Sequence, residues 1–155
     1  MNWTLRVSGV PAPKGSWDPV GCGKPVVVSG ERHYRIRDVR LKPCESDRLM
    51  RWKHAICLAV LEAGRPRAPL DGCAFAVEVV FYLHRPKLPR AALPIVAPDV
   101  DKLERAVGDV LQGIYWADDS QITDWSAHKR YADAEHPAGA EIEVTATGAQ
   151  KALDI

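Results

Sequence analysis

Apolar residues recur at helical spacing in two parts of the chain, and each pattern predicts one helix. The first helix is predicted to begin after Ser46, whose hydroxyl suits an N-cap, and to end at Gly64. Its apolar residues lie three or four positions apart: Leu49, Trp52, Ile56, Val60 and Ala63. This stripe covers one face of the helix, so we expect that face to pack on a core.

The second helix is predicted to run from Asp99 to about Gln112. Its apolar stripe consists of Val100, Leu103, Val107, Val110, Leu111 and Ile114. Pro98 favours an extended backbone where the helix begins, and Gly113 suits the position just past its end.

Four segments carry the apolar patterns of strands: Thr4–Val7, Ala74–His84, Gln121–Arg130 and Ala140–Thr147. Both faces of the second segment are largely apolar, which predicts a central strand covered on both sides. The last two are expected to form a closing hairpin through the turn at Pro137–Gly139. This order predicts an α+β fold, a small mixed sheet packed with two main helices, in a single domain over residues 1–155.

Residues 16–43 show no sustained pattern, and we expect a long irregular segment that contains a hairpin. A short strand is predicted at Val26–Val28, and Gly21–Gly23 indicates a turn. A loop of this length in a small domain is usually functional or mobile.

The charge of the chain is unevenly distributed, although 21 Lys and Arg residues against 20 Asp and Glu residues give a net charge of +1. Residues 1–90 contain 16 basic and 8 acidic residues (+8), whereas residues 91–155 contain 5 and 12 (−7). No apolar run approaches the roughly 20 residues needed to span a bilayer, and the N-terminus lacks a signal-peptide pattern. We therefore expect a cytoplasmic globular protein with no membrane partner.

The four cysteines, Cys22, Cys44, Cys57 and Cys73, include no CxxC pair. This spacing argues against a zinc knuckle, and the lack of a secretion signal argues against a disulfide framework. We expect reduced thiols, with Cys57 buried as a small apolar residue of the first helix.

Carboxylates cluster at both ends of the second predicted helix. Asp99 and Asp101 lie at its start, and Asp118 and Asp119 follow its end. Converging carboxylates suit Mg²⁺, which prefers oxygen ligands. Ordinary structural roles are equally available, because Asp is a common N-cap and turn residue, and Arg105 is placed for an i,i+4 ion pair with Asp101.

A basic, proline-rich loop, Arg85–Arg90, precedes these carboxylates. A carboxylate-bound metal ringed by Lys and Arg suits phosphodiester hydrolysis, because the metal activates water while the cations hold the DNA backbone. The sequence contains no Walker loop, GxGxxG after a strand, HExxH or nucleophile elbow, and its five histidines are scattered.

Several segments of the chain resemble the RusA family of phage- and prophage-associated Holliday-junction resolvases. The matching segments are Ala97–Leu103, Asp109–Leu111, Ile114–Ile122 and His128–Tyr131. They follow the family pattern of a D-x-D-N-L-x-K helix start, an Asp-x-Leu later in the helix, and D-D-[SA]-Q before a strand that ends in a basic residue. The loop Gly9–Gly15 is similar to the family's proline- and lysine-bearing loop.

This resemblance implies that Asp99, Asp101 and Asp119 are the essential carboxylates that bind Mg²⁺, with Mn²⁺ as a possible substitute. Asp118 is the immediate neighbour of Asp119 in the same motif. The family acts as homodimers on four-way DNA junctions and makes paired symmetric nicks, and the resemblance implies the same partners here, in a bacterial host cell. A dimer suits this task because two opposed phosphodiesters need two related sites.

Two positions depart from the family pattern: Lys102 replaces the usual Asn, and Arg105 replaces the usual Lys. Arginine keeps the charge but lacks the point-ammonium geometry and the adjustable pKa of lysine. If the position clamps phosphate, Arg105 should serve, whereas a proton-transfer role would be impaired. The Arg-rich stretch that often follows the first-strand loop in the family is also altered, to Ser16–Pro19.

The leading hypothesis is therefore a Mg²⁺-dependent endodeoxyribonuclease of the junction-resolving type, with Arg105 steadying phosphate. Candidate DNA contacts are Lys14, Arg85, Lys87, Arg90, Lys102 and Lys129. One alternative is a junction-binding protein whose catalysis is impaired by the two departures. Another is a small fold whose acidic residues serve only as caps.

Overall fold

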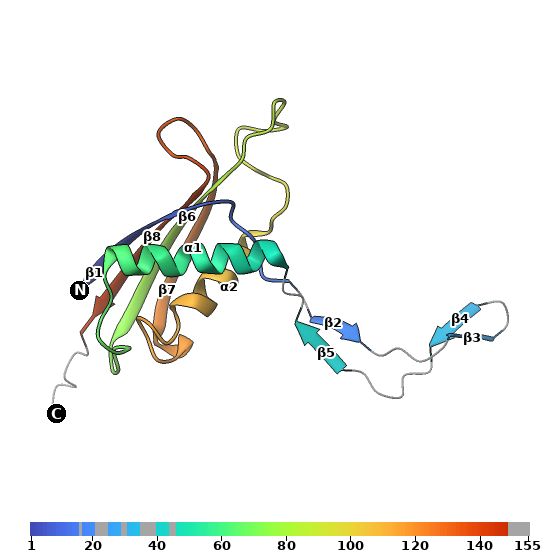
Figure 1. The fold of residues 1–155 in the computed structure, drawn as a ribbon, viewed down its shortest axis with the longest axis horizontal. Helices are drawn as coiled ribbons and strands as arrows, with labels where there is room; N and C mark the ends of the chain where they lie inside the picture. Colours follow the sequence, from blue (N-terminus) through green and yellow to red (C-terminus); the bar gives the residue numbers. More distant parts are fainter. Residues whose placement is uncertain (16, 21–24, 29–30, 35–39, 44–45, 149–155) are drawn as a thin grey trace.

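A four-stranded mixed sheet organises the fold in the computed structural model (Figure 1), which describes residues 1–15, 17–20, 25–28, 31–34, 40–43 and 46–148. The elements in chain order are β1 Asn2–Ser8, β2 Trp17–Val20, β3 Pro25–Val28, β4 Glu31–Tyr34, β5 Arg40–Pro43, α1 Asp47–Ala63, β6 Ala74–Leu83, α2 Val100–Leu111, the 3₁₀ turn η1 Asp119–Gln121, β7 Ile122–Tyr131 and β8 Gly139–Thr147. The predicted α+β class is confirmed.

The strand order in the main sheet is β1-β8-β6-β7. β6 pairs in parallel with β7, and it pairs antiparallel with β8, which in turn pairs antiparallel with β1. The sheet is therefore mixed, as predicted, and β6 is one of its two inner strands.

The expected closing hairpin is wrong. The two last strands do not pair, because β6 lies between them. The chain reaches β7 through α2, which makes β7 parallel to β6, and β8 then occupies the other edge of β6. Residues between β7 and β8 form a turn of their own, in which the Asp133 carboxylate accepts hydrogen bonds from the backbone N–H groups of Glu135 and His136. The chain between β7 and β8 therefore crosses the end of β6.

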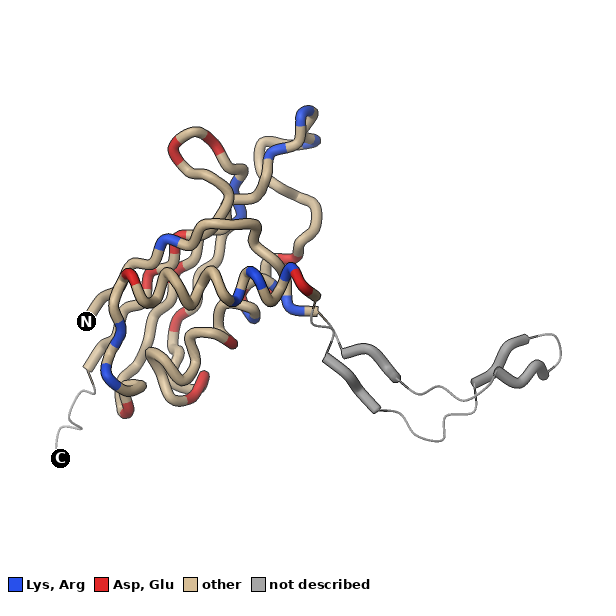
Figure 2. The backbone as a smooth tube through the Cα atoms, in the orientation of Figure 1, with Lys and Arg blue, Asp and Glu red and all other residues tan. Residues whose placement is uncertain are grey.

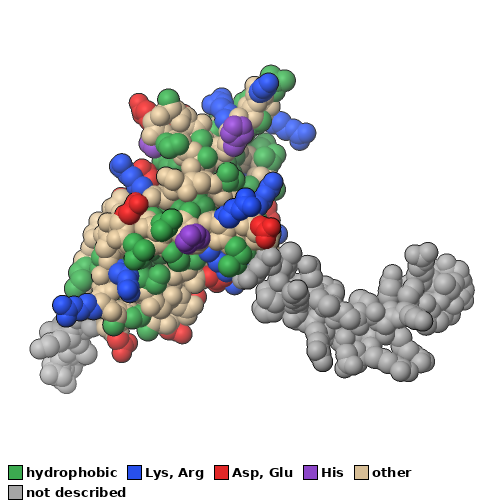
Figure 3. Space-filling model, in the orientation of Figure 1, with side chains coloured by type: hydrophobic (Ala, Val, Ile, Leu, Met, Phe, Trp, Pro, Cys, Tyr) green, Lys and Arg blue, Asp and Glu red, His purple; other side chains and the backbone are tan. Residues whose placement is uncertain are grey.

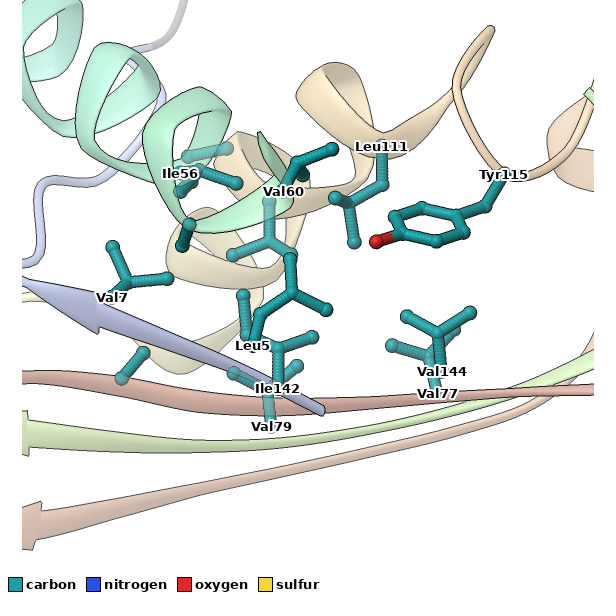
Figure 4. Packing of buried hydrophobic residues seen from close by; sticks show 14 of the residues in the cluster. Leu5, Val7, Ile56, Val60, Val77, Val79, Leu111, Tyr115, Ile142 and Val144 are labelled. Atoms are coloured by element: carbon teal, nitrogen blue, oxygen red, sulfur yellow. The ribbon is translucent and has the colours of Figure 1, made fainter. Parts of the chain in front are cut away.

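Both helices cover the same face of the sheet (Figure 4). The alternating residues Phe75, Val77, Val79 and Phe81 of β6 are buried there. Core residues from the other elements are Leu5, Leu49, Trp52, Ile56, Leu103, Val107, Leu111, Ile142 and Val144. Each helix thus packs the apolar stripe that its sequence predicts.

The opposite face of β6 is not covered as predicted. Glu78 is exposed, and the neighbouring positions Ala76, Val80 and Tyr82 are only half-buried. Since both α-helices of the described residues lie on one side of the sheet, the other side faces solvent. The apolar composition of this face of β6 led to the wrong prediction, because Val and Tyr also suit a half-exposed strand.

α1 begins and ends as predicted. The Ser46 hydroxyl accepts a hydrogen bond of 3.2 Å from the backbone N–H of Leu49, and Gly64 follows the helix with a positive φ of 84°. Cys57, however, is exposed rather than buried. It lies outside the buried stripe, in a run of the helix whose apolar residues extend onto the solvent side, including Leu58 and Leu61.

The segment before α1 contains two antiparallel strand pairs, β2 with β5 and β3 with β4. The predicted hairpin and the strand at Val26–Val28 are therefore confirmed. The predicted turn at Gly21–Gly23 and two of the cysteines, Cys22 and Cys44, lie outside the described residues. No helix in the described part of the chain has the length and apolar character needed to cross a bilayer.

Candidate active site

Asp99 is the N-cap of α2, but its carboxylate does not cap the helix. The residue is extended (φ −69°, ψ 139°), as expected behind Pro98, and its side chain makes no capping hydrogen bond. The carboxylate lies 3.2 Å from the ammonium of Lys102 and is more than half exposed. An N-cap Asp normally accepts a bond from the helix N-terminus, so this carboxylate is available for another partner.

Asp101, in the first turn of α2, forms the ion pair that its spacing predicts. Its Oδ2 lies 3.7 Å from the guanidinium of Arg105, and both side chains are largely exposed. Exposed pairs of this kind contribute at most about 1 kcal/mol. A stronger ligand can therefore displace the guanidinium at little cost.

The neighbouring carboxylates Asp118 and Asp119 have different surroundings. Asp118 is the N-cap of η1 and accepts a hydrogen bond of 2.9 Å from the N–H of Ser120, while the Gln121 side chain accepts one from the N–H of Asp118. Hydrogen bonds from Ser120 lower the pKa of Asp118. Asp118 therefore has a structural role as a cap.

Gln121 fixes this turn to the rest of the fold. Its side-chain amide donates hydrogen bonds to the backbone carbonyls of Leu70 (2.9 Å) and Cys73 (3.2 Å), just before β6. The D-D-S-Q segment is thus partly a structural device that holds η1 in place.

Asp119 points toward the core side of the turn instead. Its Oδ1 accepts a hydrogen bond of 2.8 Å from the indole nitrogen of Trp116. Trp116 is fully buried, and its ring is tilted against Phe75 and stands edge-on to Trp125, with centroids 5.5 and 6.5 Å away. A rigid aromatic cluster thus sets the direction of the Asp119 carboxylate.

Asp119 borders a hollow of about 240 Å³ between α2 and β7. The hollow is lined by Glu104, Arg105, Gly108, Asp109, Asp119, Ile122 and Trp125. Arg105 therefore belongs to this hollow and also pairs with Asp101, so it connects the first turn of α2 with the surroundings of Asp119.

The three predicted metal ligands do not form one tight cluster. Asp99 and Asp101 occupy the beginning of α2, whereas Asp119 lies beside its middle. Within the described residues, no group of three or more His, Cys, Asp or Glu side chains is arranged to hold a metal ion. Mg²⁺ commonly uses only one or two carboxylates together with waters and substrate phosphates. The exposed oxygen donors at the start of α2 fit that requirement.

Glu104 is a residue of this region that the sequence reasoning missed. It lines the hollow with Asp119, and desolvation together with the nearby Asp101 raises its pKa. Its spacing of three residues from Asp101 was the available signal, since positions i and i+3 share a helix face.

Two predicted DNA-contact residues, Lys14 and Lys129, make contacts within the protein near α2. The Lys14 ammonium lies 2.7 Å from Asp109, and its backbone N–H bonds the carbonyl of Lys102. The Lys129 ammonium donates to the carbonyls of Val96 (2.9 Å) and Pro98 (3.0 Å), just before Asp99. The Lys129 contacts fix the approach of the chain to the start of α2, whereas Lys14 attaches the segment after β1 to α2 at Lys102 and Asp109.

Lys102 lies in α2, and the three other predicted contact residues, Arg85, Lys87 and Arg90, lie in the loop between β6 and α2. Its Lys and Arg positions gather at an end that projects from the body (Figure 2). Arg85 lies over the ring of Tyr131, 5.5 Å from its centroid, while Lys87 and Arg90 are exposed. The loop leads into Asp99 along the chain, but its basic end projects away from the turn that contains η1 (Figure 1).

A comparison with known protein families identifies the family of this chain. The family model described as Endodeoxyribonuclease RusA matches residues 23–145. The chain belongs to the RusA endodeoxyribonuclease family. The match contains Asp99, Asp101, Asp118 and Asp119, and it confirms the resemblance seen in the sequence. No curated protein matches the chain.

RusA family membership implies endonuclease activity on Holliday junctions, so the chain is assigned to the DNA-cutting hydrolases that act on branched DNA. Lys14 lies outside the matched residues, whereas Lys102, Arg105 and Lys129 lie within them.

Proposed function

We propose that this chain is a Mg²⁺-dependent endodeoxyribonuclease that resolves four-way DNA junctions by paired symmetric nicks. The observation that carries the proposal is that neither the Asp99 nor the Asp119 carboxylate serves as a helix cap. Asp99 occupies an N-cap without capping, and Asp119 leaves the capping of η1 to Asp118. Both lie along α2, on a chain of an endodeoxyribonuclease family.

Asp99, Asp101 and Asp119 are not clustered in this structure, and we propose that they converge on the metal when it binds, with Mn²⁺ as a possible substitute. When bound, Mg²⁺ would polarise a phosphate oxygen and lower the pKa of a coordinated water. Trp116 holds the Asp119 carboxylate in one direction through its 2.8 Å hydrogen bond. The guanidinium of Arg105 presents a planar fork of N–H donors that suits a phosphate.

Basic residues around α2 would hold the DNA backbone on either side. Lys129 contacts the chain just before α2 and would add positive charge at the start of the helix, whereas the Lys14 ammonium lies beside Asp109, near the end of that helix. Lys102 belongs to the same turn as the carboxylates. The remaining proposed contacts, Arg85, Lys87 and Arg90, extend this surface along the projecting loop.

A homodimer would supply the second nick, because two opposed phosphodiesters in a four-way junction are related by two-fold symmetry. The substrate would be branched DNA produced during recombination and repair. We propose that the enzyme meets this substrate in the cytoplasm of a bacterial host.

One observation favours a second candidate, a junction-binding protein with impaired catalysis. Lys102 pairs with Asp99 and Arg105 pairs with Asp101, and these two cations are the departures from the family pattern. Each carboxylate of the first turn is therefore already neutralised in part by a residue that differs from the family's usual one.

A single experiment separates these possibilities. The protein is incubated with a labelled four-way junction, or with a linear duplex of the same arms, in Mg²⁺, in Ca²⁺ and in EDTA. Paired nicks in the junction that form in Mg²⁺ but not in Ca²⁺ or EDTA support the resolvase. Binding in Ca²⁺ without nicks in Mg²⁺ or Mn²⁺ supports the second candidate, and neither binding nor nicking contradicts both.

A further inference from the structure

The loop between β6 and α2, residues 84–98, carries one unusually exposed leucine. Leu88 is 90% exposed, more than any other large hydrophobic side chain in the described part of the chain. It lies between Lys87 and Pro89 in the segment Pro86–Arg90. In Figure 3 the end of this loop presents hydrophobic side chains beside Lys and Arg.

The loop is anchored at its base. Lys129 donates two hydrogen bonds to its last carbonyls, at Val96 and Pro98, and Pro94 is buried. On the other side Arg85 lies over the ring of Tyr131. A loop held at both ends keeps its projecting part in a defined place.

The residues around Leu88 also restrict its backbone. Pro86 and Pro89 each have their own φ fixed near −65°, and Pro89 steers the preceding Leu88 to extended backbone, which reduces the entropy that ordering the segment on a ligand would cost. A single exposed leucine needs no explanation by itself. An exposed leucine between two prolines, on a projecting loop that is anchored at its base, is better suited to contact a partner than an isolated surface leucine is.

The charge of the loop indicates the partner. Residues 84–98 contain three basic residues and no acidic residue. Lys87 precedes Leu88 directly, and Arg90 follows it by two positions, so phosphates on either side of the leucine would find a cation. Apolar side chains that contact base faces between such phosphate contacts are a recurrent way to open a base step.

We propose that Leu88 inserts at the branch point of a DNA junction, against base faces that the crossing strands leave unstacked. Lys87 and Arg90 bind the flanking phosphates. This inference rests on the proposed function, because it requires branched DNA as the substrate. It adds a recognition element that lies apart from the carboxylates of α2 and that favours junctions over linear duplex.

The test uses Leu88→Ser and a matched control, Leu61→Ser, which removes an exposed leucine from α1. Each protein is titrated, in Ca²⁺ without cleavage, onto a four-way junction with 2-aminopurine at the branch point and onto a linear duplex of the same length. Wild-type protein and Leu61→Ser should raise the 2-aminopurine fluorescence, which reports unstacking.

Leu88→Ser should lose this rise and bind the junction about tenfold more weakly, the size expected for one lost apolar contact. Its affinity for the duplex should stay unchanged, and Leu88→Phe should restore the signal. Equal weakening on both DNAs, or a full fluorescence rise with Leu88→Ser, would overturn the inference.

The failure of this inference is distinguishable from that of the proposed function. If wild-type protein nicks junctions and Leu88→Ser keeps both the signal and the junction preference, only the inserted leucine is wrong. If wild-type protein shows no junction preference, the proposed function and the inserted leucine are both overturned.

Discussion

The indole nitrogen of Trp116 donates a hydrogen bond of 2.8 Å to the carboxylate of Asp119. The donor belongs to a fully buried ring and the acceptor to an exposed turn, so the core determines the direction of a surface carboxylate. Asp118, one residue earlier, points back into the turn and caps it. The two adjacent aspartates therefore have different roles: Asp118 caps η1, and the Asp119 carboxylate is oriented by Trp116.

Trp116→Phe should keep most of the aromatic packing but release Asp119. We expect cleavage of a junction to fall about tenfold, which corresponds to about 1.4 kcal/mol of lost transition-state stabilisation, while junction affinity in Ca²⁺ changes little. Trp52→Phe is the control, because the buried indole nitrogen of Trp52 has no hydrogen-bond partner among the described residues. Equal cleavage by the two variants would contradict the positioning role.

Arg105→Lys should retain most of the cleavage activity, because a cation at this position still neutralises phosphate and lysine is the family's usual residue. Arg105→Ala should lower it about tenfold or more, as expected for a lost charge-assisted contact. The measurement is the cleavage rate as a function of pH. A pH profile shifted by Arg105→Lys would instead indicate that residue 105 takes part in proton transfer.

Lys102→Asn should tighten metal binding, because it frees Asp99 from an ammonium 3.2 Å away. The pair is exposed and contributes at most about 1 kcal/mol, so we expect up to about a fivefold lower Mn²⁺ dissociation constant. Electron paramagnetic resonance of Mn²⁺ without DNA measures it directly. Lys87→Asn is the control for net charge, and an equal gain in both variants would refute a local effect.

Tyr115 should make the fold sensitive to alkaline pH. Burial raises the pKa of Tyr115 from 10.0 to about 12, and its hydroxyl donates a 2.9 Å hydrogen bond to the carbonyl of Gly64. The folded state therefore holds this proton more tightly than the unfolded state. The contribution to stability is fully present below pH 10 and declines as the pH rises from about 10 toward 12.

Urea unfolding of wild type and Tyr115→Phe at neutral and alkaline pH measures this effect. At neutral pH the variant should be less stable by about 1 kcal/mol, the usual contribution of one hydrogen bond. Between pH 10 and 12 its stability should fall less steeply than that of wild type. Parallel curves would show that Tyr115 does not contribute to the alkaline loss.

The helices were predictable because their signals are local. Capping by Ser46, the extended residue at Asp99 and the two apolar stripes depend on residues within a few positions of each other. The strand order was not predictable in the same way. Whether β8 pairs with β7 or β6 depends on the route of the chain across the sheet, and the turn sequence before Gly139 does not determine that route.

The candidate site was predictable only in part for the same reason. The spacing of Asp99, Asp101 and Arg105 follows from the helix, and their ion pairs follow from that spacing. The difference between Asp118 and Asp119 depends on Trp116, whose ring packs against Phe75 of the distant strand β6. Long-range packing of this kind leaves no local signal in the sequence.

The most direct test of the central claim compares junction cleavage by Asp119→Asn and Asp118→Asn in Mg²⁺. Both substitutions remove one negative charge, and asparagine can still cap η1 at position 118. We predict that Asp119→Asn loses at least about a hundredfold in cleavage rate, comparable to the loss of one preorganised electrostatic contact, whereas Asp118→Asn stays close to wild type. Undiminished cleavage by Asp119→Asn would contradict the account.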